Sequence, residues 1–222
     1  MSLATMLQQD VVDELAWDPS VDASEIGVTT SDQGVVTLSG HVTSYYEKAC
    51  AEKAARRVAG VTAMANDLIV NPPYVRDDEE ITRDVLSGLA LTVVVPAEHI
   101  HVSVHRGWVT LDGKVKWQFQ KIAAEYSIWQ VPGVLGVHNR IRVEANPSKR
   151  KVKEQIEAAL ARNARLDAQG IYVETQGHTV TLRGTVNSLA EKDEAEQAAW
   201  MAPGVEEVHN LLEVDMLAHD RG

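Results

Sequence analysis

A short phrase, Val-Thr-Leu-x-Gly-x-Val, occurs three times in this chain of 222 residues. Its glycines are Gly40, Gly113 and Gly184, which are 73 and 71 residues apart. A Gly-Val pair and an Asn-x-aliphatic-x-Val segment recur at the same two offsets. Three signals in one register indicate a structural unit that is repeated along the chain. The sequence therefore predicts three small, similar repeats, although length alone would favour one or two domains.

Each repeat has the same expected order of elements. A helix with aliphatic residues at every fourth position comes first, followed by an alternating strand, a glycine-containing turn, the Val-Thr-Leu strand, a second helix and a third strand. This αββαβ order predicts an α+β fold, in which each repeat is a three-stranded mixed sheet packed on two helices. We place the repeats at residues 1–71, 74–145 and 147–217, because Asn71-Pro72-Pro73 and Asn146-Pro147 are typical of linkers.

The repeated unit resembles the BON domain, a family named after a bacterial osmotic-stress protein and nodulation proteins. In the first copy the resemblance is carried by Asp18-Pro19-x-Val21-Asp22-Ala23, the Val-Thr-Leu-x-Gly phrase, Glu47-Lys48-x-x-Ala51, the Gly-Val pair and the Asn-x-Leu-x-Val strand. It covers nearly the whole chain as three tandem domains and is weakest before Ile100. The resemblance implies an αββαβ fold and a non-catalytic binding role, and it associates the chain with bacterial envelopes, osmotic-shock protection and phospholipid contact.

The composition argues against nucleic-acid binding and against a disulfide-linked fold. Asp and Glu total 32 against 21 Lys and Arg, and the net charge of −11 is unfavourable for contact with nucleic-acid phosphates, so no nucleic-acid partner is expected. Charge is uneven along the chain: residues 1–73 hold four basic and ten acidic side chains, whereas residues 74–146 hold eight and nine. Cys50 is the only cysteine, so an intramolecular disulfide framework is excluded.

Motifs of catalysis are absent from the sequence. It has neither a Walker-type phosphate-binding loop nor a Gly-x-Ser-x-Gly elbow. His99, His101 and His105 lie close together, but we expect them to face outward from a hairpin and not to converge on a metal ion. The sequence therefore predicts no catalytic residue, no metal, no cofactor and no enzymatic activity.

The first ten residues lack the features of a secretory leader. They contain no basic segment and no apolar stretch of the 7–15 residues that a signal peptide needs. No window approaches the ~20 apolar residues of a membrane span. As written, the chain is expected in the cytoplasm; if a leader has been removed ahead of it, the expected compartment is the periplasm.

The second helix of the middle repeat carries apolar side chains on two faces. One face matches the core stripe of the other copies, and the opposite face carries the large side chains Phe119, Ile122, Tyr126 and Trp129. Trp200 lies at the corresponding position of the third copy. Because monomers rarely expose large apolar patches without a use, three interpretations stay open. In the first, the face packs against neighbouring repeats. In the second, it joins two copies of the chain, and in the third, it contacts a lipid or protein partner.

A basic cluster precedes and begins the first helix of the third repeat, and it consists of Lys149, Arg150, Lys151 and Lys153. Cations at this end oppose the helix dipole. The cluster suggests contact with an anion or an acidic phospholipid surface. The alternative is a solvated linker whose cations pair with nearby acids.

Together, these features predict a non-enzymatic binding or scaffold protein of the BON type, connected with stress, that contacts phospholipid or a protein partner. The alternative is a structural repeat module that forms homo-oligomers and takes no small ligand.

Overall fold

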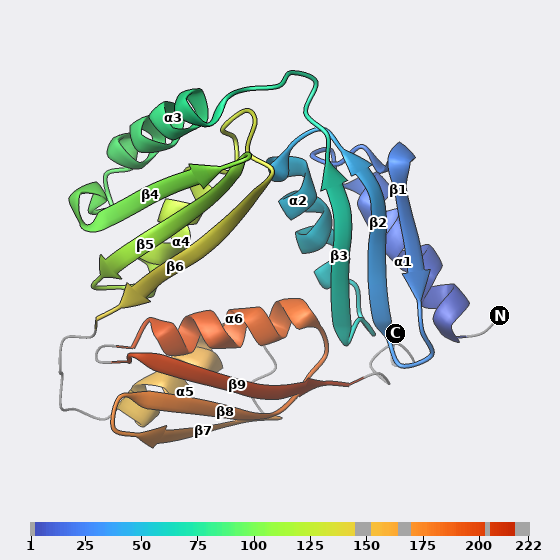
Figure 1. Ribbon diagram of the computed structural model, residues 1–222. Coiled ribbons are helices and arrows are strands. Elements are labelled where there is room, and N and C mark those ends of the chain that lie inside the picture. The colour runs from blue at the N-terminus through green and yellow to red at the C-terminus, as the bar shows by residue number, and fades with distance from the viewer. Residues whose placement is uncertain (1–2, 145–151, 164–169, 203–204, 216–222) are drawn as a thin grey trace. The chain divides into compact units, whose positions relative to one another are not determined.

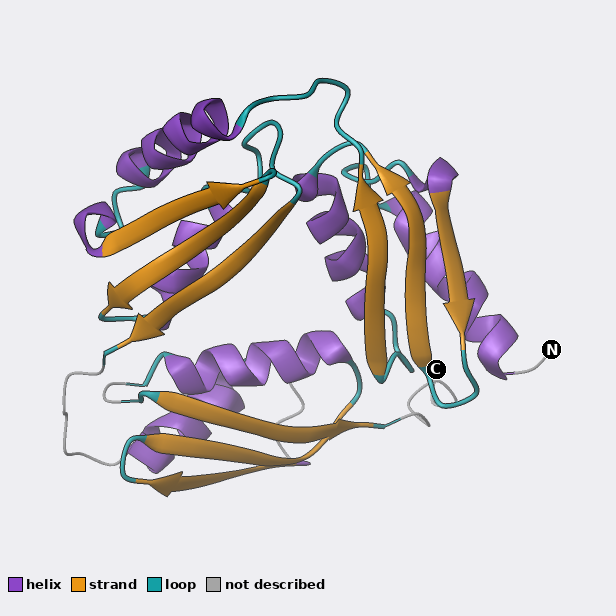
Figure 2. Ribbon diagram, viewed as in Figure 1, coloured by secondary structure: helices purple, strands orange, loops and turns teal. Residues whose placement is uncertain are grey.

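The protein is described here by a computed structural model covering residues 3–144, 152–163, 170–202 and 205–215 (Figure 1). Three three-stranded sheets have the strand orders β1-β2-β3, β4-β5-β6 and β7-β8-β9. Two α-helices accompany each sheet, and Figure 2 distinguishes these helices from the strands by colour. The predicted α+β fold, with three αββαβ repeats, is confirmed.

The three repeats use elements of similar length in the same order. The first contains α1 (Leu3–Trp17), β1 (Ile26–Thr30), β2 (Val35–Val42), α2 (Tyr45–Arg56) and β3 (Ala63–Val70). The second contains α3 (Asp78–Leu91), β4 (Ile100–His105), β5 (Trp108–Val115), α4 (Gln118–Tyr126) and β6 (Gly136–Val143). The third contains α5 (Val152–Arg162), β7 (Ile171–Gln176), β8 (Thr179–Val186), α6 (Leu189–Trp200) and β9 (Glu207–Val214). Short 3₁₀ helices at Ala23–Glu25 and Ala97–His99 precede β1 and β4.

The Val-Thr-Leu strand lies at the centre of each sheet. In the second sheet β4 pairs with β5 in an antiparallel hairpin, and β5 pairs with β6 in parallel. The third sheet repeats this pattern with β7, β8 and β9. A parallel pair needs a long crossover connection, and α4 and α6 supply it in these two sheets. The mixed sheet therefore follows directly from the order of elements.

Aliphatic side chains at the predicted spacings form the cores. The second core gathers residues from both helices and all three strands of its repeat, and its members with almost no exposure are Ile81, Val85, Leu89, Val109, Leu111, Ala124, Ile128 and Ile141. The third core uses corresponding positions, and its most buried members include Ile156, Leu160, Val180, Leu182, Ala195, Ala199 and Leu212. Alternation along the strands leaves the other face of each of these sheets mainly to polar and charged residues, with Trp108 and Leu211 as exposed apolar exceptions.

Contacts along the backbone divide the chain into two compact parts. One consists of Met1–Ser39, Ala51–Asp67 and Ala145–Gly222, and the other of Gly40–Cys50 and Leu68–Glu144. The first part thus includes the whole third repeat and most of the first. The second part includes the whole second repeat together with the start of α2 and the end of β3.

Asp78, in the first turn of α3, holds the hairpin turn between β4 and β5. Its carboxylate accepts the backbone N–H groups of Arg106 at 2.8 Å and Gly107 at 2.9 Å. Arg106 has a φ of 50°, a left-handed conformation that is uncommon outside glycine. The bonds from Gly107 and then Arg106 hold the pKa of Asp78 below its ordinary value of 3.8. The carboxylate therefore couples the first helix of this repeat to its hairpin.

We expect the stabilising effect of Asp78 to depend on pH. Because the pKa is lower in the folded chain than in the unfolded one, the stabilisation is present above the ordinary value and is lost as the pH falls through the folded pKa. The difference in thermal midpoint between the wild type and Asp78→Asn should be largest at neutral pH and shrink under acid. Glu79→Gln, at an exposed i,i+4 pair, is the control. A difference that stays constant down to strong acid would contradict the assignment.

Candidate functional site

Helix α4 begins by a variant of the capping arrangement used in the other repeats. In the first repeat Ser44 accepts the N–H of Glu47, and in the third Ser188 accepts the N–H of Glu191. The second repeat has Trp117 at this position, whose side chain makes no capping bond of that kind. The other half of the arrangement is kept, because Gln120 Oε1 accepts the backbone N–H groups of Lys116 and of Trp117, at 3.0 and 3.1 Å, as Glu47 accepts that of Thr43 and Glu191 that of Asn187.

Helix α4 is also shorter than its counterparts, with nine residues against twelve in α2 and α6. It ends at Tyr126, and the following residues form a turn in which Ser127 Oγ donates to the carbonyl oxygen of Ala124 at 2.7 Å. Trp129 therefore lies in this turn and does not continue the helical face that the sequence predicts. The other three candidate residues, Phe119, Ile122 and Tyr126, lie within the helix as expected.

The predicted face remains partly open to solvent. Phe119 is 52% exposed and Tyr126 is 49% exposed, whereas Ile122 and Trp129 are half-buried. The rings of Tyr126 and Trp129 meet edge to face with their centroids 4.4 Å apart. We call Phe119, Ile122, Tyr126 and Trp129 the α4 surface. It presents large apolar side chains on the side of the helix that does not face the core.

Part of the α4 surface contacts the first helical turn of α2. Tyr45, which lies in the same compact part of the chain, is edge to face with Trp129 at a centroid distance of 6.4 Å. The Trp129 Nε1 is buried and has no hydrogen-bond partner among the described residues. Trp129 is thus engaged with a neighbouring repeat, while the exposed area of the surface lies at Phe119 and Tyr126.

The other candidate interface residue, Trp200, has a different environment. It is the last residue of α6, is half-buried, and packs against the third core. The corresponding outer faces of α2 and α6 are mixed, with Tyr46, Ala49, Lys53 and Arg56 in one and Ala190, Asp193, Gln197 and Trp200 in the other. Arg56 and Asp193 form a two-pronged ion pair with distances of 2.9 and 2.6 Å. Only in the middle repeat do all four of these positions carry large apolar side chains.

Most of the predicted basic cluster lies outside the described residues. This applies to Lys149, Arg150 and Lys151. Lys153 is described as an exposed residue of α5, with its Nζ 3.6 Å from Glu157 Oε1 in an i,i+4 pair. Such exposed pairs contribute little to stability.

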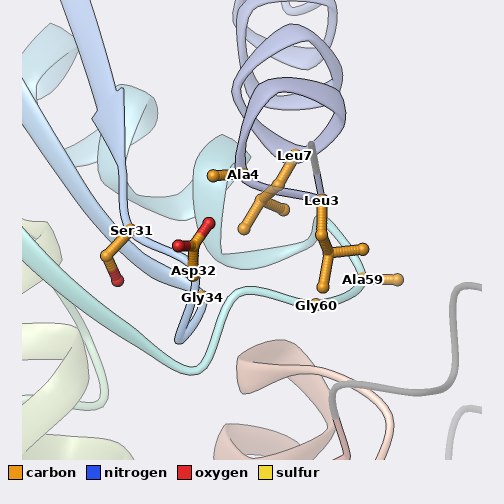
Figure 3. Close-up of a pocket in the computed structure, with 8 residues that line it drawn as sticks. All are labelled: Leu3, Ala4, Leu7, Ser31, Asp32, Gly34, Ala59 and Gly60. Carbon is orange, nitrogen blue, oxygen red and sulfur yellow. The ribbon is translucent and has the colours of Figure 1, made fainter. Parts of the chain in front are cut away.

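A small hollow in the first repeat is too narrow for a ligand. It lies between α1, the turn after β1 and the turn after α2, and its volume of about 10 Å³ suits a single water molecule. Figure 3 shows Leu3 and Leu7 with the carboxylate of Asp32 among its lining residues. No group of three or more His, Cys, Asp or Glu side chains in the described ranges is placed to hold a metal ion.

A much larger hollow, of about 780 Å³, lies at the second sheet. Its lining includes four basic residues, Lys114, Lys116, Arg140 and Arg142, together with His99 and His101. From the sequence the histidines are expected to face outward, but nothing in it connects them with these cations. The sequence shows two arginines, Arg140 and Arg142, at alternate positions of an expected strand. Which residues of the neighbouring strand lie beside them is known only from the strand pairing.

None of the helices in the described part of the chain is both long enough and apolar enough to cross a membrane.

Comparison with known proteins gives a family match over nearly the whole chain. The BON domain model matches residues 4–72, 77–145 and 148–216. Osmotically-inducible protein Y of Escherichia coli (strain K12) is 33% identical over 136 residues, which are 56% of this chain and 65% of that protein. The match therefore spans just under two thirds of the length of that relative.

Among solved structures, the C-terminal domain of CdsD, a structural protein of the type III secretion system of Chlamydia trachomatis, aligns with 94% of this chain. The alignment covers 97% of that structure at 16% identity, with a TM-score of 0.27. A second structure of CdsD aligns with 95% of the chain at the same identity and TM-score. A TM-score of this size supports no argument about arrangement or function.

Proposed function

The chain belongs to the BON domain family, which matches it three times, and from this premise we propose that it is a stress-related, non-enzymatic protein that binds a phospholipid surface through α4. The connection with stress rests on the similarity to osmotically-inducible protein Y. The observation that carries the proposed contact is the exposure of Phe119 and Tyr126 on a helix whose counterparts have mixed outer faces. Trp129 packs edge to face against Tyr126 beside them.

The chemistry of the α4 surface suits the interface of a bilayer. Aromatic rings such as those of Phe119 and Tyr126 bury a large apolar area, and the hydroxyl of a tyrosine can stay in contact with water or headgroups. Amphipathic helices bind membranes with such residues on one side and polar residues on the other. Since the chain carries a net charge of −11, we expect this contact to be driven by apolar burial and to occur on uncharged vesicles.

Flotation with phosphatidylcholine vesicles tests the proposal. The double variant Phe119→Asp/Tyr126→Asp should reduce vesicle binding by roughly tenfold or more, because each charge must be removed from water to enter the interface. The matched control is Tyr172→Asp, at an aromatic residue of β7 that is also exposed. Wild-type protein that fails to float, or equal loss in the control, would contradict phospholipid contact through α4.

A second function, self-association through the same surface, is favoured by its apolar character alone. Light scattering after size exclusion distinguishes it from lipid contact. A stable dimer that the Phe119→Asp/Tyr126→Asp variant abolishes, in protein that does not bind vesicles, would support an oligomer-forming module. A monomer that floats with vesicles would support the first function.

A further inference from the structure

The second sheet has one face turned away from its helices, and the pairing of the strands determines which side chains share it. Residues in register on neighbouring strands lie side by side, and every second residue along a strand points the same way. His101, Asp112 and Arg140 form one row across the three strands. Lys114 and Arg142 form the next row. We call this side of β4, β5 and β6 the open face.

Cations outnumber acids in the lining of the hollow at this face, where Lys114, Lys116, Arg140 and Arg142 lie with Glu98, Asp112 and Glu144. Lys114 is paired with Glu144, with the Nζ and Oε1 atoms 2.5 Å apart. Neither Arg140 nor Arg142 has an ion-pair partner among the residues that the structure describes, and the same is true of Lys116. Asp112 is in register with Arg140 but forms no ion pair with it within the described ranges. The hollow over these residues, about 780 Å³, falls in the size range of small-ligand sites.

Placing these cations together opposes folding. Lys114 and Arg142 lie directly opposite each other on paired strands, and like charges in that relation are destabilising. Arg140 is only two residues from Arg142 on the same face of β6. An anion seated between the guanidinium groups would remove the repulsion and gain charge-assisted hydrogen bonds. The arrangement is therefore favourable with an anion present.

The other two repeats provide an internal comparison, because they build the same sheet without these cations. At the positions of Arg140 and Arg142, the first repeat has Asp67 and Ile69. The third repeat has Leu211 and Glu213 there. Lys114 is replaced by histidine or threonine, and Lys116 by threonine or asparagine. Since the fold tolerates acidic, apolar and neutral residues at these positions, it does not require arginine or lysine at any of them.

We propose that the open face of the second sheet is a binding site for a phosphate-bearing anion, with Arg140 and Arg142 as its main contacts and Lys114 and Lys116 as supporting charges. Guanidinium groups bind phosphate through two parallel hydrogen bonds, which favours phosphate as the recognised group. Side chains two residues apart on a strand are about 7 Å apart at the backbone. A ligand with more than one phosphate, or an array of phosphate headgroups, therefore fits better than a single monovalent ion.

This site does not depend on the α4 contact, because it lies on the sheet face away from the helices, whereas the α4 surface belongs to a helix; with a headgroup as its ligand, the site would deepen the proposed phospholipid binding. The phosphate could come from two sources, a free oligophosphate or a phospholipid headgroup. The test therefore uses both, with the full chain in each case. Inorganic tripolyphosphate is titrated calorimetrically, and binding to phosphatidylglycerol vesicles is compared with binding to phosphatidylcholine vesicles.

The main variant is Arg140→Leu/Arg142→Glu, which gives the second repeat the residues that the third repeat already carries. It should fold, and it should weaken tripolyphosphate binding, or the preference for phosphatidylglycerol, at least tenfold. The control, Arg83→Leu/Arg183→Glu, changes the net charge equally at two arginines elsewhere that are paired only with exposed acids. Its binding should stay within twofold of the wild type, about the scatter expected for uncoupled surface changes.

Binding of tripolyphosphate identifies a free phosphate ligand, and a preference for phosphatidylglycerol vesicles identifies a headgroup; either result supports the site if the main variant alone loses it. Absence of both at millimolar ligand and low salt would overturn the proposal. So would equal weakening in the control, or binding of citrate as tight as that of tripolyphosphate, since citrate carries only carboxylates. The Phe119→Asp/Tyr126→Asp variant should leave tripolyphosphate binding unchanged, which separates failure here from failure of the α4 contact.

Discussion

Replacing Gly184 with alanine should lower the free energy of unfolding of the third repeat by about 3 kcal/mol. Gly184 lies within β8, has a φ of 125°, and belongs to the phrase that recurs in all three repeats. A Cβ at this position would collide with the backbone carbonyl oxygen of Gly170, where the chain enters β7. Neither the backbone conformation nor the close approach of two chain segments can be relieved by moving a side chain.

Gly177→Ala is a matched control for Gly184→Ala within the same repeat. Gly177 also has a left-handed conformation, with a φ of 63°, but a Cβ there would meet no atom within 4 Å. Its replacement should lower the free energy of unfolding by only about 1 kcal/mol, because alanine is disfavoured in a left-handed backbone conformation. Hydrogen exchange of the β8 and β9 amides measures both changes in the repeat concerned. Equal effects of the two substitutions would mean that the close approach does not explain the recurring glycine.

The repetition of the sequence is the reason that its fold could be predicted. A single Val-Thr-Leu segment is consistent with many folds, but three copies in one register separated positions with a shared structural role from those that vary. The glycine of the phrase illustrates this. A Cβ at Gly113 would collide with the carbonyl oxygen of His99, and a Cβ at Gly184 would collide with that of Gly170. The buried valine and leucine of the phrase, Val109 and Leu111 in the second repeat, follow from strand alternation.

The candidate sites were less predictable for two physical reasons. Helical periodicity predicts a single apolar face that reaches Trp129. In the structure α4 ends at Tyr126, and the chain turns where the Ser127 hydroxyl donates to the carbonyl oxygen of Ala124. The open face depends on strand register, which brings Lys114 beside Arg142 from a position 28 residues away along the chain. The signal available beforehand was the contrast among copies at single positions, since Arg140 and Arg142 correspond to Asp67 and Ile69 in the first copy and to Leu211 and Glu213 in the third.

The two apolar sides of α4 should respond very differently to truncation. Ile128 follows the helix, is fully buried in the second core and contacts residues from the sheet, so Ile128→Ala should cost about 3 kcal/mol of unfolding free energy. Phe119 keeps about half of its surface exposed, so Phe119→Ala should cost less than about 1 kcal/mol. Hydrogen exchange of the β5 amides, measured in the full chain, reports both values.

The relative effects of Phe119→Ala and Ile128→Ala on stability also test the proposed contact with phospholipid. If Phe119→Ala destabilises the second repeat as much as Ile128→Ala, the outer side of α4 is packed in solution and has no area left for a bilayer. If the cost is small and vesicle flotation is weakened, the same side chain contributes to binding and little to folding. A residue of that kind, large, apolar and dispensable for stability, is what distinguishes an interaction surface from a core.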